Sequence, residues 1–201
     1  MKLALLRHGP TLWNGQGRIQ GHTDIPLSDE GLEKVRGLLP PPGFEKARAF
    51  VSTSRRARQT AEALGLTDAI WDARLMEQNW GEWEGLSRAS ILARDGEDAF
   101  RRAGSENGDA FRPPGGESTA ELHARVAAFL KDVAKSQSDA IVVAHLGVLR
   151  AVYTLATGWD MGAPMPPDLD VSKVLIVTLT PDGTPRIDRL NVELPVRSRT
   201  V

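Results

Sequence analysis

Residues 5–14 read LLRHGPTLWN, so an arginine and a histidine directly follow a short apolar run that starts at Leu3. Such a run is typical of a strand buried on both faces, as in a parallel sheet. Three other segments have the same character, at 49–52, 141–144 and 174–179. The opening segment therefore predicts the first strand of an α/β fold, with Arg7 and His8 at its carboxyl end.

Helical patterns lie between these predicted strands. Ser28 precedes one and is a favourable N-cap residue, and residues 55–64 are rich in helix formers and stop at Gly65. Residues 118–121 read STAE, a capping box, and open an amphipathic helix. A further helix is expected over 148–157. This alternation of strands and helices favours an α/β fold with a mostly parallel sheet.

The remaining segments complete the predicted architecture. Residues 174–180 and 186–192 flank a Pro-Asp-Gly turn and predict a hairpin at the end of the chain. Residues 79–117 interrupt the alternation, and we expect an insertion there, with a helix near 87–102, that covers a site. The prediction is a three-layer sandwich with helices on both faces, a mostly parallel central sheet and an antiparallel edge strand. At 201 residues, one domain over 1–201 is expected.

Composition narrows the classes of partner. The net charge of −1 gives no electrostatic basis for binding nucleic acid or an anionic membrane. The chain has no cysteine, which excludes disulfides, thiolate nucleophiles and thiolate metal ligands. The apolar run before Arg7 is too short for a signal peptide, and no longer run approaches a membrane span, so a cytoplasmic location is expected. No feature indicates a particular oligomeric state.

Two histidines are predicted to meet at one edge of the sheet. His8 follows the first strand, and His145 follows the strand at 141–144. Ligands of open α/β sheets bind outside the carboxyl ends of the strands, so two histidines at matching positions can share one site. Either histidine alone would more simply be an ordinary, partly buried residue. The pair, with Arg7 beside it, favours a functional site.

A metal centre and an anion site are the two alternatives for these histidines. His22 and Asp24 could add ligands to a metal site. However, Arg7 and the basic segment at 55–58 would repel a cation. Guanidinium groups bind multi-oxygen anions bidentately, and a neutral imidazole is a competent nucleophile. Phosphate chemistry without a metal therefore fits these residue types best.

Six blocks of sequence, taken in order, resemble one known family. They are RHGPTLWN (7–14), GRIQGHTDIPLSDEGL (17–32), STSRRARQTAEAL (52–64), LMEQNWGEWEG (75–85), PPGGES (113–118) and IVVAHLGVLRA (141–151). Together they resemble the histidine phosphatase superfamily, which has the phosphoglycerate mutase-like fold. The NWGEWEG segment resembles its phosphatase branch, and α-ribazole phosphatases are one group within that branch.

The resemblance implies a role for each matching residue of the phosphoryl site. His8 would be the nucleophile and would become phosphohistidine. Arg7, Arg56 and His145 would surround the phosphoryl oxygens, and Asn14 would complete this pocket. In-line phosphoryl transfer needs such a nucleophile and positive donors on the equatorial oxygens. No metal or cofactor is then required.

The resemblance also implies an acid and a substrate-lining segment. Glu77 would protonate the departing alcohol, with Glu82 or Glu84 as alternatives for that role. Gln20 and Gly21 fall where family members often line the substrate pocket.

Two residues depart from the family pattern and put its usual substrates in doubt. Pro10 stands where many members, including the mutases, have an acidic residue, and Leu146 stands where a glycine is usual. Because the NWGEWEG segment resembles the phosphatase branch, we expect a metal-independent phosphomonoesterase acting on a small phosphorylated metabolite. The alternatives are a cofactor-dependent phosphoglycerate mutase and a non-catalytic phosphate-binding protein.

Overall fold

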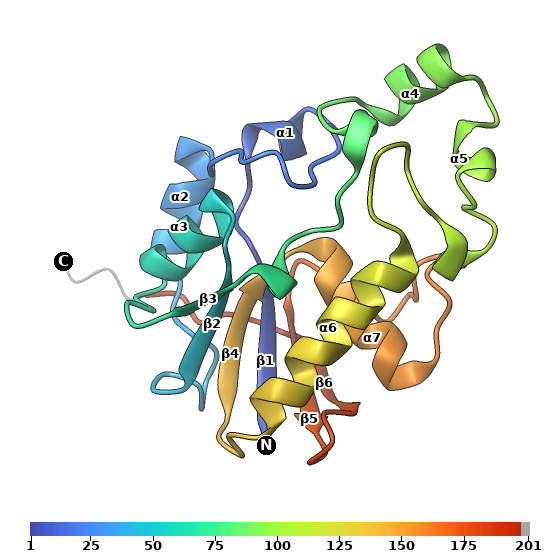
Figure 1. Cartoon of the computed structure of the whole chain (residues 1–201). Coiled ribbons are helices and arrows are strands. Elements are labelled where there is room, and N and C mark those ends of the chain that lie inside the picture. The colour runs from blue at the N-terminus through green and yellow to red at the C-terminus, as the bar shows by residue number, and fades with distance from the viewer. Residues whose placement is uncertain (198–201) are drawn as a thin grey trace.

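The computed structural model describes residues 1–197 and contains one six-stranded sheet in that range (Figure 1). The strand order is β3-β2-β4-β1-β5-β6. The strands are β1 (Lys2–Arg7), β2 (Arg48–Ser52), β3 (Ile70–Asp72), β4 (Ala140–Ala144), β5 (Val174–Leu179) and β6 (Pro185–Val192).

The first four strands in sequence run parallel to one another, and β5 runs antiparallel to both β1 and β6. The predicted hairpin is confirmed, because β5 and β6 form the antiparallel pair at one edge of the sheet. Gly183 in its turn has φ of 89°, a conformation that glycine adopts without strain. The prediction of a mostly parallel sheet with an antiparallel edge is therefore confirmed.

Helices cover both faces of the sheet, which confirms the three-layer prediction (Figure 1). Leu3 and Leu5 of β1 join a cluster with α6 (Thr119–Ala134) and α7 (Leu146–Thr157). Ala4 and Leu6 point to the opposite face and join a cluster with α2 (Asp29–Arg36) and α3 (Arg55–Ala63). Successive side chains of a strand alternate between faces, so an unbroken apolar run supplies both cores.

The predicted caps are present. Ser28 accepts a hydrogen bond from the backbone of Gly31 at the start of α2, and Ser118 forms the full capping box with Glu121 at the start of α6. Helix α7 ends at Gly158, whose φ is 77°, but begins at Leu146, two residues earlier than predicted. His145 is its N-cap residue, so β4 passes into α7 through that histidine.

Three elements differ from the prediction. Strand β3 was not predicted because it is a short edge strand whose Trp71 is 59% exposed. Helix α1 (Leu12–Gly15) was also not predicted. The single helix expected near 87–102 is two helices, α4 (Arg88–Asp95) and α5 (Ala99–Arg102), because Gly96 has φ of 95° and ends the first. Short 3-10 turns complete the chain at η1 (Ala73–Leu75), η2 (Gly81–Trp83) and η3 (Gly108–Ala110).

None of the helices within residues 1–197 combines the length and the apolar character needed to cross a membrane.

Candidate active site

The register of the two central strands brings the two predicted histidines together. Arg7 of β1 pairs with Ala144 of β4, so the next residues, His8 and His145, leave the sheet side by side. The backbone N–H of His8 donates to the carbonyl of Ala144 at 2.9 Å, and the two imidazole ring centroids are 5.1 Å apart. The predicted meeting of these residues at the carboxyl edge of the sheet is confirmed.

The surroundings of His8 fix its protonation and its tautomer. Burial, and then the charges of Arg56 and Arg7, lower the pKa of His8 from 6.5 to about 3, so the ring is neutral at neutral pH. Its Nδ1 lies 2.7 Å from the carbonyl oxygen of Gly9. A carbonyl oxygen can only accept a hydrogen bond, so Nδ1 carries the proton and Nε2 keeps a free lone pair.

Helix α3 is tied to the loop that carries His8. The hydroxyl of Thr60 accepts from the backbone N–H of Gly9 at 2.9 Å and donates to the carbonyl of Arg56 at 2.7 Å. A Cβ on Gly9 would lie 2.6 Å from a methyl of Val35, so glycine lets α2 pack against this loop. These contacts set the position of Arg56 relative to His8.

His145 is completely buried and has one ring nitrogen without a protein partner. Its Nε2 lies 2.8 Å from the hydroxyl of Ser52 and 3.2 Å from that of Ser54. Burial, and then the repulsion that a protonated His145 would meet from a protonated His8 and from Arg56, hold the pKa of His145 well below its usual value. Nδ1 has no hydrogen-bond partner among the described residues.

Arg56 is also completely buried, and a loop holds it in place. Its two terminal nitrogens donate to the carbonyl of Gly21 at 2.8 Å and to that of Thr23 at 3.1 Å. Burial lowers the pKa of the guanidinium below its usual value, but an arginine stays charged at neutral pH. Gly21 does not line the pocket described below, and its carbonyl accepts a hydrogen bond from Arg56 instead.

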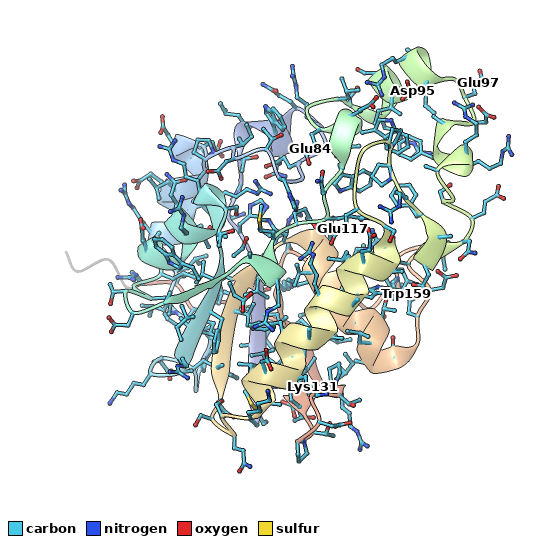
Figure 2. The ribbon with its side chains drawn as sticks, in the orientation of Figure 1. Glu84, Asp95, Glu97, Glu117, Lys131 and Trp159 are labelled. Atoms are coloured by element: carbon cyan, nitrogen blue, oxygen red, sulfur yellow. The ribbon has the colours of Figure 1, made fainter. Side chains whose placement is uncertain are left out.

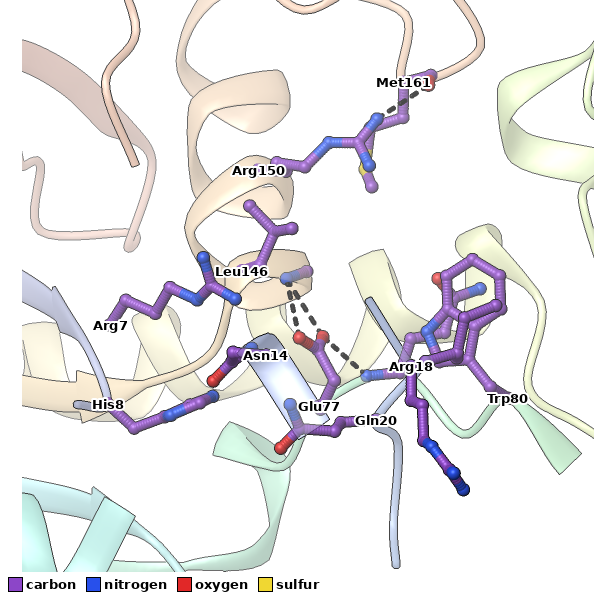
Figure 3. Close-up of a pocket in the computed structure, with 13 residues that line it drawn as sticks. Arg7, His8, Asn14, Arg18, Gln20, Glu77, Trp80, Leu146, Arg150 and Met161 are labelled. Atoms are coloured by element: carbon purple, nitrogen blue, oxygen red, sulfur yellow. Dashed lines mark hydrogen bonds between the residues drawn. The ribbon is translucent and has the colours of Figure 1, made fainter. Parts of the chain in front are cut away.

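A pocket of about 180 Å³ opens beside His8 (Figure 3). Four of the other predicted site residues line it: Arg7, Asn14, Gln20 and Glu77. The rest of the wall is formed by Arg18, Ile19, Gln78, Trp80, Leu146, Gly147, Arg150 and Met161. Arg56 and His145 lie deeper, and neither lines this opening.

Thr11 orients the two amide side chains of the pocket. Its hydroxyl lies 3.0 Å from the side-chain oxygen of Asn14 and 3.0 Å from that of Gln20. Its backbone N–H also donates to the Asn14 oxygen at 2.9 Å. The Asn14 oxygen accepts from the Thr11 backbone N–H, so the NH₂ group of Asn14, a donor, is free of that contact. The single hydroxyl proton of Thr11 goes to one of the two amide oxygens at a time.

Glu77 lies on the pocket wall beside the first turn of α7 (Figure 3). Its Oε1 accepts from the backbone N–H groups of Gly147 and Gln78, each at 2.9 Å. A Cβ on residue 147 would lie 2.2 Å from that oxygen, so a glycine is needed there. Of the three acids considered from the sequence, Glu77 lines the pocket, whereas Glu82 and Glu84 do not.

An ion pair holds the backbone of Glu77 in place. Arg125 of α6 binds Glu117 through two hydrogen bonds of 2.6 and 2.9 Å and donates to the carbonyl of Glu77 at 3.0 Å. His22 lies 3.0 Å from that same carbonyl through its Nε2. Figure 2 shows Glu117 at the start of α6. The sequence does not mark Arg125 or Glu117 as site residues, because their effect depends on a contact between distant segments.

Glu84 joins the two loops that border the site. Its carboxylate accepts from the backbone N–H groups of His22 and Thr23, each at 2.7 Å, from that of Trp80 at 3.1 Å, and from the Thr23 hydroxyl. A Cβ on Gly21 would lie 2.0 Å from this carboxylate. Glu84 therefore positions the carbonyls that hold Arg56.

The pocket also contains side chains that the sequence analysis did not assign to it. Arg18, Arg150 and Met161 line the wall beyond Glu77. Trp80 also lines it and belongs to the insertion that was expected to cover the site. Arg150 follows Leu146 by four residues in α7, so the spacing of one helical turn was a usable signal. Of the two departures from the family pattern, Leu146 lies on the wall of this pocket and Pro10 does not.

Within residues 1–197, no group of three or more His, Asp or Glu side chains is arranged to hold a metal ion.

Comparisons with known proteins show which proteins this chain resembles. A family model described as the histidine phosphatase superfamily (branch 1) matches residues 3–193. A 2,3-bisphosphoglycerate-dependent phosphoglycerate mutase of Methylobacterium radiotolerans is 32% identical, over 99% of this chain and 94% of its own. A metal-independent phosphoserine phosphatase of Arabidopsis thaliana is 34% identical, over 78% of this chain and 68% of its own.

A solved structure gives the same result for the fold. The mycobacterial glucosyl-3-phosphoglycerate phosphatase has a TM-score of 0.74 and 27% identity, over 96% of this chain and 99% of its own. The family model matches residues 3–193, which is nearly all of the chain. The alignment with the mutase covers 94% of that protein. The protein therefore belongs to the histidine phosphatase superfamily.

Proposed function

We propose that the protein is a metal-independent phosphomonoesterase that hydrolyses a small phosphorylated metabolite through phosphohistidine on His8. The observation that carries this proposal is the 2.7 Å contact from His8 Nδ1 to the carbonyl of Gly9. It leaves the Nε2 lone pair of a neutral imidazole free beside Arg7, Arg56 and His145. A neutral, oriented imidazole among cationic donors is the arrangement that nucleophilic attack on a phosphate ester requires.

In the first step, Nε2 of His8 attacks phosphorus and the bond from phosphorus to the ester oxygen breaks. Glu77 gives its proton to the departing alkoxide, which leaves as the alcohol. The guanidinium groups of Arg7 and Arg56 neutralise the charge on the equatorial oxygens, and the neutral imidazole of His145 would donate a hydrogen bond to one of them. The Gly9 carbonyl stabilises the positive charge that His8 gains when Nε2 is phosphorylated.

In the second step, water attacks the phosphohistidine. Glu77, now a carboxylate, takes a proton from the water, the bond from phosphorus to Nε2 breaks, and inorganic phosphate leaves. One carboxyl group thus serves as acid and then as base. Its two contacts to the N–H of Gly147, at 2.9 and 3.2 Å, hold it on the leaving-group side of the pocket through both steps.

We further propose that one domain carries this activity and that residues 79–117 cover its leaving-group side. Trp80 of this insertion lines the pocket, which supports the second statement. Arg7 and His8, which follow β1, would then handle the phosphoryl group, and the insertion would contact the alcohol.

A phosphoglycerate mutase is the second candidate, because the mutase relative matches 99% of this chain. A mutase would transfer the phosphoryl group back to substrate rather than to water. It would interconvert 2- and 3-phosphoglycerate, with a bisphosphorylated primer, and release no net phosphate.

The test measures phosphate release by wild type and His8→Ala in the presence of a chelator. The panel contains phosphoserine, both phosphoglycerates, α-ribazole phosphate and 4-nitrophenyl phosphate. We expect release by wild type and none by His8→Ala. Release that requires an added metal ion would contradict the mechanism, and interconversion of the phosphoglycerates without release would support the mutase. Binding of these esters without turnover would indicate a non-catalytic protein.

A further inference from the structure

Two serine hydroxyls face the buried ring of His145. Strands β2 and β4 are paired and parallel, so Ser52, the last residue of β2, lies beside His145, which follows β4. The Nε2 atom of His145 lies 2.8 Å from the Ser52 hydroxyl and 3.2 Å from that of Ser54. All three side chains are buried. The pairing of the two strands therefore encloses a small polar cluster at His145.

Ser54 is the N-cap residue of α3, yet its side chain makes no capping hydrogen bond. A serine at this position usually accepts from a backbone N–H of the first turn, a bond that stabilises the helix. Here the Asp24 carboxylate binds the start of the helix instead, because it accepts from the backbone N–H of Arg55 at 2.6 Å. The Ser54 hydroxyl is thus left to face His145.

The protons of this cluster decide which ring nitrogen of His145 carries a hydrogen. Each hydroxyl has one proton to donate, and a buried hydroxyl needs an acceptor for it. In the described part of the chain, the acceptors within reach of either hydroxyl are Nε2 and the other hydroxyl, which lies at 3.5 Å. The Ser52 oxygen already accepts from the backbone N–H of Ser54 at 3.4 Å. Nε2 is therefore the acceptor, and the single ring proton of a neutral His145 is on Nδ1.

We propose that Ser52 and Ser54 are positioning residues that hold His145 in its Nδ1–H tautomer. Nδ1 is the buried ring nitrogen that has no hydrogen-bond partner among the described residues. In the other tautomer a lone pair would stand at Nδ1, and a lone pair repels the oxygens of a phosphate group. This inference rests on the proposed function, in which His145 donates to a phosphoryl oxygen, and it identifies the groups that make His145 a donor.

The two histidines of the site are then fixed in complementary ways. The Nδ1 proton of His8 is held by the carbonyl of Gly9 at 2.7 Å, which leaves its Nε2 lone pair to attack. In His145 the serine hydroxyls hold Nε2, which leaves the Nδ1–H to donate. Burial keeps both rings neutral, so the hydrogen bond at one nitrogen decides what the other nitrogen can do.

NMR of the histidine ring nitrogens tests the tautomer in wild type, without any variant in the cluster. Two-bond correlations between ring protons and ring nitrogens distinguish the Nδ1–H tautomer, the Nε2–H tautomer and the imidazolium. The chain has four histidines, so the spectrum is simple, and His145→Gln identifies the signals of that ring. We expect the Nδ1–H tautomer at His145 at pH 7. The Nε2–H tautomer or an imidazolium would overturn the inference.

Serine variants link the tautomer to turnover. Ser52→Ala, Ser54→Ala and the double variant are compared with Ser136→Ala, which removes a hydroxyl that donates to a carbonyl at 2.8 Å in the turn after α6. The double variant should lower kcat by about 10²-fold on every ester, the usual cost of losing one donor to a developing anion, with little change in KM. It should also lose the uniform Nδ1–H signal of His145. Ser52→Thr keeps the hydroxyl and should retain most of the activity, and the control should be unchanged.

Two results from the double variant would overturn the inference while leaving the phosphatase function intact. One is a kcat equal to that of wild type. The other is a loss of activity while His145 keeps the Nδ1–H tautomer, which would mean that the serines act only on the fold. If wild type hydrolyses no ester but His145 shows the Nδ1–H tautomer, the proposed function fails and the assignment of the tautomer stands. The wild-type spectrum decides the assignment even if the double variant does not fold.

Discussion

The edge of the sheet and the insertion at 79–117 are built in different ways. At the edge, Arg56 and His145 are completely buried, and the pairing of β1 with β4 sets the positions of His8 and His145. The insertion has its own small core, in which Trp83 packs against Phe100 with ring centroids 4.7 Å apart. Its helices α4 and α5 bury a single residue each. The phosphoryl site is therefore part of the main core, whereas the insertion has a separate core and is joined to the site through Glu84 and Glu117.

This difference fits separate roles for the two regions in substrate binding. Under the proposed function, backbone pairing fixes the groups that would act on phosphorus, which every phosphate ester presents in the same form. Side chains of the insertion and of α7 would form the wall that meets the alcohol, which differs between esters. Glu77 lies between the two regions, because its backbone is held by Arg125 and its carboxylate by Gly147.

The largest expected effect is at the sheet edge. His8→Ala should lower phosphate release by about 10⁴-fold or more for every ester, because it removes the nucleophile itself. Steady-state rates across the ester panel measure this. The variant should still bind inorganic phosphate through the arginines, which shows that it is folded. A loss confined to some esters would mean that His8 contacts the alcohol instead.

Glu77→Gln should have the next largest effect, roughly 10²- to 10⁴-fold in kcat, because the amide can neither give nor take the proton. The effect on the first step should be smaller for 4-nitrophenyl phosphate, whose leaving group needs no proton. Rapid mixing should then show a burst of nitrophenol followed by slow turnover. Equal losses on alkyl and nitrophenyl esters in the first step would contradict the role of Glu77 as acid.

Gly147→Ala should lower activity by roughly 10- to 100-fold, because its Cβ would displace the Glu77 carboxylate from a contact at 2.2 Å. Gly15→Ala is the matched control, since a Cβ there meets nothing within 4 Å. The two variants are compared by kcat and by thermal unfolding. Full activity in Gly147→Ala would show that the position of Glu77 is not important for turnover.

The histidines of the sheet edge should also make the stability depend on pH. The unfolded chain protonates His8 below about pH 6.5, whereas burial and the two arginines lower the pKa in the folded protein to about 3. The unfolded state therefore binds more protons between these values, and stability falls as the pH drops through that window. By pH 5 the loss from His8 is about 2 kcal/mol.

Urea unfolding at pH 7.5 and pH 5 measures this loss in wild type and in His8→Gln, which cannot titrate there. We expect the variant to lose less stability than wild type over this interval. An equal loss in both proteins would show that His8 does not carry the effect.

Local sequence patterns predicted the buried elements of the fold well, because burial requires a clear pattern of apolar residues. The unbroken apolar run in β1 and the capping box before α6 indicated elements that the structure contains. Strand β3 was missed because it lies at an edge and two of its three residues are exposed. The helix expected near 87–102 was interrupted by one glycine, whose φ the sequence alone does not determine.

The sequence predicted the site residues that directly follow a recognisable strand, and it did not predict contacts between distant segments. His8 and His145 follow buried strands, so topology alone places them together. The ion pair of Arg125 with Glu117 ties α6 to the backbone of Glu77. No local pattern in the sequence reveals such a contact. The contact between Gly21 and Arg56 is likewise hidden from local patterns, because the two residues are 35 positions apart in the chain.

Trapping the phosphoenzyme tests the central claim most directly. Wild type is mixed with a substrate ester in chelator and quenched in alkali, in which phosphohistidine is stable, and the modified residue is located by mass spectrometry. The account predicts one phosphoryl group on His8 in wild type and none in His8→Ala, with more accumulating in Glu77→Gln on 4-nitrophenyl phosphate. Turnover without any phosphorylated histidine, or phosphorylation at another residue, would contradict it.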